Sequence, residues 1–378
     1  MALFDLVFEG GGAKGAAFGG AMDAFTTAGH KPRRIIGTSA GAITATLIGA
    51  GYSAKEMLAA CEETLPGTNT PVFTTFMDAP QASDFSQQDR QNSQTMQLLQ
   101  LVHLPFGAKL DTAVLNALLD VELYREVFCF NECGGFYAGN AFLKWLRGKL
   151  QAKGLDPDIT WGKFAAQTHS DVSVVTSDVK GPDTPPANDR GAPEMVVLNA
   201  RTAPDCPVAF SVRMSMSIPF VWREMIWQPE WGLYRGASKT GHTFVDGGVL
   251  SNFPLELVTV PGPETTAIMG NTDPNGAGTL GLLLDETLPV PGVPVSPTPR
   301  PRLRSADRVT RLVDAMTGTS DADVMRQFPD LICHLPVQHY GTTEFRMSQD
   351  KMNRLIDAGR DAMNKYLNRL AATATVNT

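Results

Sequence analysis

The stretch FEGGGAKGAAFGG at Phe8–Gly20 follows the apolar run LFDLV at Leu3–Val7. An apolar run that ends in a glycine-rich turn predicts a strand followed by a loop. The Ala-rich segment Ala16–Ala28 predicts a helix, and a short strand around Ile35 and a second helix at about Ala42–Ala50 come next. Because strand and helix alternate at this spacing, we expect an α/β fold with a parallel sheet. Functional loops of such sheets lie at the carboxyl ends of the strands.

Length and composition are those of a globular protein. The 378 residues exceed the usual domain size, so we expect one large elaborated domain or two domains. Hydrophobic residues make up 43% of the chain and charged residues 19%. The net charge of −7, from 39 acidic and 32 basic residues, argues against broad electrostatic binding of nucleic acid.

Three features bear on the cellular compartment. The chain begins without a basic segment before its first predicted strand, so we expect no signal peptide. No apolar stretch reaches the ~20 residues that a membrane-spanning helix needs. Five scattered cysteines predict reduced thiols. We therefore expect a cytoplasmic protein, although export by a signal-less route would leave no trace in these features.

A candidate nucleophile follows the second predicted strand, where residues 37–41 read GTSAG. Between a strand and a helix, G-x-S-x-G is typical of a nucleophile elbow, whose central serine adopts a strained backbone conformation. Side chains at Gly37 or Gly41 would collide with that turn. The pattern predicts Ser39 as a nucleophile at a helix N-terminus, where amide groups favour negative charge. An ordinary turn in which Ser39 caps the helix is the plainer alternative.

A serine of ordinary acidity is a weak nucleophile and needs a base within hydrogen-bond reach. Asp246 ends a β-like run and is followed by Gly247 and Gly248. An Asp-Gly turn without a catalytic role is the alternative interpretation. His334 and His339 come later in the chain and satisfy the order Ser, Asp, His of an α/β-hydrolase triad.

The glycine loop also admits two interpretations. Gly10, Gly12 and Gly15 form a G-x-G-x-x-G after a strand, which is typical of a loop that binds a dinucleotide pyrophosphate. A dinucleotide-binding unit needs an acid about 20 residues further on, and the region His30–Gly37 contains none. The same backbone amides would alternatively stabilise the oxyanion of an acyl-transfer reaction.

Taken in order, EGGGAKG at Glu9–Gly15, GTSAG at Gly37–Gly41 and DGG within Asp246–Pro254 resemble the patatin-like phospholipase family. The segment RMSMSIPF at Arg213–Phe220 is similar to a further block of that family, with Met where Ala is commoner. The resemblance covers most of residues 1–270. It implies a three-layer α/β/α fold with a central, mostly parallel sheet, and lipid acyl hydrolysis by a Ser-Asp dyad.

Carried over residue by residue, the resemblance implies that Ser39 is the nucleophile and Asp246 the general base. It assigns the oxyanion hole to the loop residues Gly10, Gly11, Gly12, Ala13, Lys14 and Gly15. Supporting turn positions would be Gly37, Gly41, Gly247 and Gly248. The implied substrate is a phospholipid or another acyl lipid, cleaved through an acyl-enzyme during transient contact with a membrane surface. We expect no cofactor and no metal, and the need for a protein activator stays open.

The domain organisation follows from shifts in composition. Residues 1–270 predict a patatin-like catalytic domain, with an inserted helical cap at about 66–123 where Thr, Gln, Ser and Asn become frequent. Residues 271–378 contain a Pro-rich segment and then apolar residues at helical spacing. We expect this second part to complete the same domain.

Overall fold

A central sheet organises the molecule, a computed structural model that describes residues 2–101, 108–180, 192–271, 277–293 and 321–376. Its strands are β1 (Leu3–Phe8), β2 (Lys31–Thr38), β4 (Asp171–Asp178), β5 (Glu194–Leu198), β7 (Met225–Ile226), β10 (Thr243–Asp246), β11 (Gly278–Pro289) and β12 (Ile332–Gln338). Their order is β12-β11-β1-β2-β4-β10-β7, and β5 also pairs with β4. Strands β11 and β12 from the C-terminal part of the chain therefore extend the sheet that β1 begins.

Most of the strand pairs are parallel, as the alternation of strands and helices predicted. The parallel pairs are β12 with β11, β11 with β1, β1 with β2, and β2 with β4. The antiparallel pairs are β10 with β4, β10 with β7, and β4 with β5. The predicted central, mostly parallel sheet is confirmed.

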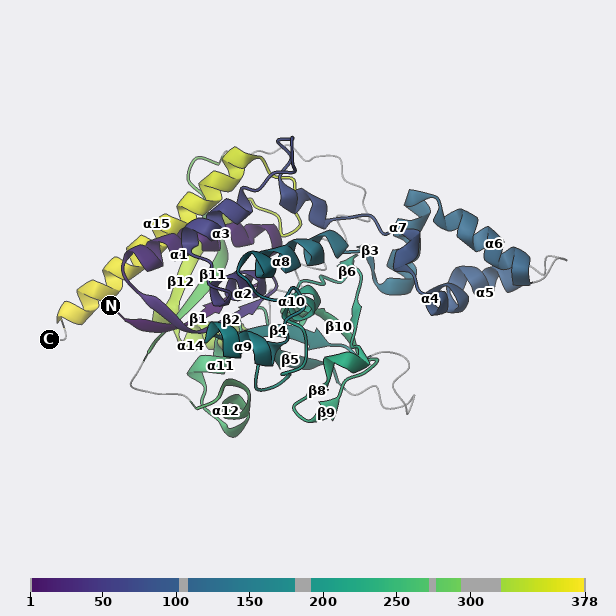
Figure 1. Cartoon of the computed structure of the whole chain (residues 1–378). Helices are drawn as coiled ribbons and strands as arrows, with labels where there is room; N and C mark the ends of the chain where they lie inside the picture. Colours follow the sequence, from purple (N-terminus) through teal and green to yellow (C-terminus); the bar gives the residue numbers. More distant parts are fainter. Residues whose placement is uncertain (1, 102–107, 181–191, 272–276, 294–320, 377–378) are drawn as a thin grey trace.

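Helices cover both faces of the sheet (Figure 1). One face packs against α1 (Ala16–Thr27), α2 (Ala40–Gly49), α3 (Ala54–Cys61), α8 (Asn140–Ala152), α9 (Trp161–Thr168), α10 (Val208–Ser215) and α15 (Gln349–Val376). The other packs against α11 (Glu256–Thr259), α12 (Pro263–Met269) and α14 (Ala322–Gln327). Neighbouring strand residues alternate between the two cores, as Leu6 and Phe8 do against Val7. The fold is a three-layer α/β/α sandwich.

The C-terminal helix α15 lies along α1, as Figure 1 shows. A side chain at Gly20 would overlap the backbone of Ile356, and one at Gly359 would overlap the backbone of Ala17. These glycines allow the two helix backbones to approach closely. The helix predicted from the apolar spacing near the C-terminus therefore docks on the core.

An arm of helices extends from the body of the molecule (Figure 1). It consists of α4 (Gln87–Asn92), α5 (Gln94–Leu101), α6 (Ala108–Leu119) and α7 (Glu122–Cys133), and its small core includes Phe85, Leu115 and Phe128. The last helix of the arm, α7, ends at Cys133, and the arm overlaps the segment of about 66–123 that was predicted as an inserted cap. Most of the predicted Pro-rich segment, residues 294–301, lies outside the described residues.

The remaining elements are short. They are β3 (Gly135–Tyr137), β6 (Phe220–Trp222), β8 (Leu233–Tyr234), β9 (Ala237–Ser238) and the 3-10 helices η1 (Gly12–Gly15), η2 (Val72–Phe76), η3 (Ala82–Asp84), η4 (Pro229–Trp231), η5 (Gly247–Val249) and η6 (Pro329–Leu331). Within the described ranges, no helix is long and apolar enough to cross a lipid bilayer. No group of three or more His, Cys, Asp or Glu in those ranges is arranged to hold a metal ion.

Candidate active site

The sheet register brings the ends of β2 and β10 together. Strand β5 occupies one edge of β4 along Val174–Asp178, so β2 and β10 share the opposite edge. Strand β2 runs parallel to β4 and ends with Thr38 opposite Val175. Strand β10 runs antiparallel to β4 and ends with Asp246 opposite Thr176, the next residue along. The two strands therefore point their carboxyl ends at each other, which places residue 39 beside Asp246.

Ser39 lies in the sharp turn between β2 and α2. Its φ of 52° and ψ of −116° are a strained conformation for a residue with a side chain. A side chain at Gly37 would overlap the backbone of Gly41, and one at Gly41 would overlap the carbonyl group of Phe8. Both predicted motif glycines thus make room for the turn. The Ser39 N–H donates to Ser215 Oγ at 2.8 Å, which fixes the turn against α10.

Asp246 is a buried carboxylate, 1% exposed. Its backbone N–H donates to Ser217 O at 2.9 Å, and its Oδ1 accepts from the Gly248 N–H at 2.8 Å. Its Oδ2 is buried and has no hydrogen-bond partner of good geometry among the described residues. Burial raises the pKa of Asp246 to about 7, against the opposing effects of the Ser39 hydroxyl and the Gly248 amide. A side chain at Gly247 would overlap the backbone of β4.

The structure separates the amides of the glycine loop into two groups. Three donate inside the protein: Gly10 N–H to Asn252 O at 3.0 Å, Ala13 N–H to Thr342 O at 2.9 Å, and Lys14 N–H to Gly11 O at 3.1 Å. An amide that is already bonded is not available to an oxyanion. Of the loop residues predicted to form the oxyanion hole, Gly10, Ala13 and Lys14 therefore have amides that are engaged within the protein.

The amides of Gly11 and Gly12 have no hydrogen-bond partner in the part of the chain that the structure describes. Gly12 has a φ of 54°, and a side chain there would overlap the carbonyl oxygen of Thr342. Gly15 lies against Ala40, next to the turn that contains Ser39. Gly11 lines the same pocket as Ser39 on one side, and Gly12 lines the same pocket as Ser39 on the other, so the two free amides belong to residues near Ser39.

Lys14 lies within the site, not on an exposed part of the loop. Its side chain is 6% exposed, and its Nζ forms an ion pair with Glu286 of β11, whose side chain is 61% exposed. The buried ammonium group of Lys14 is therefore paired with a carboxylate that reaches the surface.

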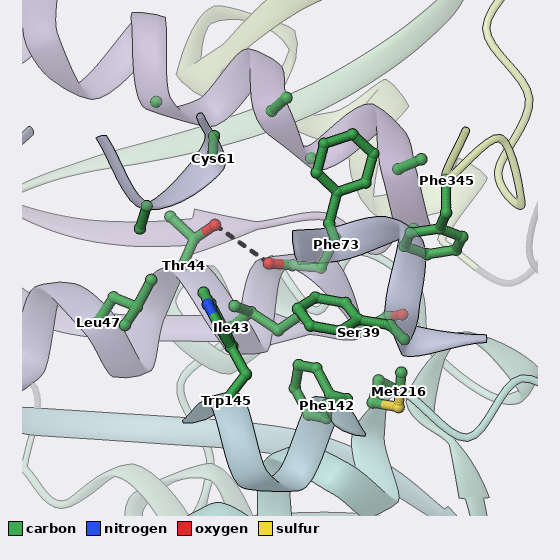
Figure 2. Close-up of a pocket in the computed structure, with 18 of the residues that line it drawn as sticks. Ser39, Ile43, Thr44, Leu47, Cys61, Phe73, Phe142, Trp145, Met216 and Phe345 are labelled. Atoms are coloured by element: carbon green, nitrogen blue, oxygen red, sulfur yellow. Dashed lines mark hydrogen bonds between the residues drawn. The ribbon is translucent and has the colours of Figure 1, made fainter. Parts of the chain in front are cut away.

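Two pockets of different character meet at Ser39. The apolar pocket is lined by residues that include Ile43, Leu47 and Phe142, and Figure 2 shows Ser39 at one end of it. The polar pocket is lined by Ser39 and Asp246 together with Glu9, Gly10, Gly11, Lys14, Asn252, Asp285, Glu286, Thr287 and Thr342, among others. Hydrocarbon can therefore lie on one side of Ser39 while polar groups lie on the other.

The two histidines considered from the sequence lie elsewhere. His334 is on β12, three strands from β2, which corresponds to about 14 Å across the sheet. Its Nδ1 bonds to Asp285 Oδ2 at 2.8 Å. His339 is exposed in the segment after β12. Neither histidine lines the apolar or the polar pocket.

Four residues of the site received no role from the sequence. Asn252 accepts from Gly10 and donates from Nδ2 to Glu9 Oε1 at 3.2 Å, while Glu9 Oε2 accepts from the Leu284 N–H at 2.6 Å. Burial raises the pKa of Glu9 to about 8. Ser215 and Asn252 lie in segments that resemble family blocks, which was an available signal. Thr342 lies far from every motif, so no local pattern pointed to it.

The chain is similar to a known protein family and to a bacterial relative. A family model described as patatin-like phospholipase matches residues 6–259. The chain is 28% identical over 375 residues to the uncharacterized protein YqhO of Bacillus subtilis (strain 168), covering 96% of this chain and 97% of that protein.

Two solved structures are also similar to the chain. VipD from Legionella pneumophila has a TM-score of 0.48 and 15% identity, covering 97% of this chain and 67% of VipD. ExoU in its complex with SpcU, from the type III secretion system of Pseudomonas aeruginosa, has a TM-score of 0.41 and 17% identity. That match covers 97% of this chain and 52% of the other, so the present chain spans about half of its length.

Proposed function

The chain belongs to the patatin-like phospholipase family, and on that premise we propose that it hydrolyses acyl lipids with Ser39 as nucleophile and Asp246 as general base. One observation carries the dyad: two strands end head to head against β4, so that the nucleophile turn meets a buried carboxylate oxygen without a partner of its own. The described residues that line the two pockets include no histidine, so Asp246 and not an imidazole is the proposed base.

In the proposed reaction, Ser39 Oγ attacks the ester carbonyl carbon and its proton passes to Asp246 Oδ2. The amides of Gly11 and Gly12 stabilise the oxyanion, and each such donor is typically worth about 100-fold to 1000-fold in turnover. Collapse of the intermediate breaks the ester C–O bond, and Asp246 returns the proton to the leaving alcohol. Water then attacks the acyl-Ser39 ester with Asp246 again as base, the bond between Ser39 Oγ and the acyl carbon breaks to release the fatty acid, and Asp246 returns the proton to Ser39 Oγ. A pKa near 7 suits a group that both accepts and returns this proton.

The two pockets suggest how the substrate lies. Its acyl chain would occupy the apolar pocket, and its alcohol part would leave through the polar pocket, where Lys14 and Glu286 form their ion pair. The acyl-enzyme would then keep its hydrocarbon away from water while the leaving group departs on the polar side.

We further propose that residues 1–270 and 271–378 form one catalytic domain, with the helical arm as its inserted cap. The pairing of β11 with β1 supports this organisation. Transient contact with a membrane surface is proposed from the substrate class. Exposed apolar side chains on the arm support it, namely Leu98, Leu101, Val121, Leu123 and Val127.

The alternative of nucleotide binding finds no support at the glycine loop. Arg33 and Arg34 are cations of this region that could meet the 2′-phosphate of a dinucleotide, and both are engaged elsewhere. Arg33 pairs with Asp5 at 2.6 Å, and Arg34 donates to Asn271 O. A Ser-Asp-His triad fails because His334 and His339 lie outside both pockets.

A lipid panel tests the proposal. Wild type, Ser39→Ala and Asp246→Asn are incubated with defined phospholipids, galactolipids and neutral esters, and released products are identified by mass spectrometry. We expect free fatty acid from the wild type and a loss of about 10⁴-fold or more in both variants. Asp178→Asn is the control for removal of a buried carboxylate. Asp178 is paired with Lys239 at 2.9 Å and is not part of the proposed dyad. Near-native hydrolysis by Ser39→Ala or Asp246→Asn would overturn the dyad.

A further inference from the structure

The apolar pocket follows one face of α2. Ser39 immediately precedes the helix, and the helix contributes Ile43, Thr44 and Leu47, a spacing of four and then three or four residues that places side chains on one side of a helix. Figure 2 shows Ser39 near one end with Met216, and Leu47 at the opposite end. Leu47 is the last residue of α2 in the lining. The distance along the helix axis from Ser39 to Leu47 therefore gives the length of the pocket beside this helix.

The lining offers hydrocarbon and almost no hydrogen bonding. Apart from Ser39, the hydroxyl that α2 contributes is that of Thr44, which donates to Ala40 O at 3.1 Å and is thereby satisfied. Figure 2 shows Phe73 and Phe142 on opposite sides of the space. An unbranched alkyl chain matches such a lining, because a polar ligand would lose its water without new partners.

The length of the pocket follows from helix geometry. Leu47 is eight residues after Ser39, which is about 12 Å along the axis at about 1.5 Å per residue. An extended alkyl chain advances about 1.25 Å per carbon, from C–C bonds of about 1.5 Å at angles of about 111°. About ten carbons therefore span the distance.

Resting on the proposed function, we propose that the apolar pocket selects an unbranched acyl chain of about ten carbons, and that Leu47 and Ala60 set this limit. Ala60 of α3 is buried in the lining beside Cys61, which Figure 2 shows on the same side as Leu47. A larger side chain at Ala60 shortens the space, and a smaller one at Leu47 lengthens it. Longer chains must bend or leave their distal carbons outside the pocket.

Two variants with matched controls test the limit in opposite directions. Ala60→Leu fills the pocket, and its control Ala59→Leu adds the same side chain to an exposed neighbour on α3. Leu47→Ala removes the end wall, and its control Leu150→Ala opens a buried site on α8 outside the lining. Each control therefore carries the local cost of the substitution without its effect on the pocket.

The readout is kcat/KM for p-nitrophenyl esters of four to sixteen carbons. In the wild type and both controls we expect a rise of about three- to fourfold per added methylene, which stops near ten carbons. Ala60→Leu should move the break about two carbons shorter, and Leu47→Ala about two carbons longer. A slope that continues unchanged to sixteen carbons, or a break that neither variant moves, would overturn the proposal.

Binding separates this proposal from the proposed function. Calorimetric titration of Ser39→Ala with fatty acids of six to twelve carbons reads the same limit without catalysis. A gain in affinity per carbon that stops near ten supports the pocket length even if no ester is hydrolysed, in which case the proposed function alone fails. Absence of any affinity gain with chain length would overturn the pocket proposal while leaving Ser39-dependent hydrolysis intact.

Discussion

The two pockets that meet at Ser39 differ in almost every physical respect. On the apolar side, α2 presents Ile43 and Leu47, and the hydroxyl of Thr44 is already bonded. On the polar side lie Asp246 and Glu9, two carboxyl groups whose pKa values burial raises to about 7 and about 8. In the proposed reaction the two sides would have different roles: the apolar side would hold the hydrocarbon of the substrate, and the polar side would handle charge and protons at the ester bond.

Two residues with positive φ lie where the two pockets meet, namely Ser39 and Gly12. The Ser39 amide is bonded to Ser215, and the amide of Ala13, next to Gly12, is bonded to Thr342, so both turns are held by residues distant in sequence. Farther from Ser39, the apolar pocket is lined largely by side chains of α2, α3 and α8. Substitutions on the polar side or where the two pockets meet should therefore impair the chemical step, while those farther along the apolar pocket should change substrate selection.

After substitution of the two dyad residues themselves, the largest expected effect comes from Gly12→Ala. The new side chain would overlap Thr342 O and displace the free amides of Gly11 and Gly12. We expect kcat to fall by about 100-fold to 1000-fold with little change in KM, because oxyanion donors act chiefly in the transition state. Steady-state kinetics on a soluble ester measures both constants.

Gly154→Ala is the matched control. Gly154 has a φ of 75°, and no atom lies near the position of an added side chain. It therefore carries the same kind of backbone cost away from the site, and its kcat should stay close to that of the wild type. A Gly12→Ala enzyme that changes only KM would contradict the assignment of these amides to the oxyanion.

A smaller effect concerns pH. Asp246 must be deprotonated to accept the Ser39 proton, so activity should rise with pH through about 7. Glu9 is neutral below about pH 8, and its charge above that value opposes the oxyanion. We expect a bell-shaped profile of kcat/KM, each limb changing by up to about tenfold per pH unit.

Glu9→Gln separates the two limbs of the pH profile. The amide keeps the shape of the side chain and stays neutral, so the alkaline fall should disappear while the rise through about pH 7 remains. Loss of the lower limb in Glu9→Gln would show that Glu9, and not Asp246, is the group that titrates there.

Much of the fold could be predicted because its first elements are local. Strand β1, the glycine loop and α1 follow one another without a long connection, and G-x-S-x-G marks the start of α2. The family resemblance rested on the same local segments. The need for glycine at positions 37 and 41 could be predicted from the motif, because side chains at these two positions would collide with the turn.

The rest depends on contacts between distant segments. No local pattern indicates that β2 and β10 share one edge of β4, although this register brings Ser39 to Asp246. The loop amides could not be sorted either, since their partners Asn252 and Thr342 lie more than 200 residues away. Phe345, from the C-terminal part, completes the apolar pocket without any signal in sequence.

The most direct test of the account is covalent labelling of the nucleophile. The protein is treated with an alkyl fluorophosphonate, digested, and mapped by peptide mass spectrometry. We predict one phosphonyl adduct on the peptide that contains Ser39, absent in Ser39→Ala and formed more slowly in Asp246→Asn. An adduct on another residue such as Ser215, or lipid hydrolysis without any labelling of Ser39, would contradict the central claim.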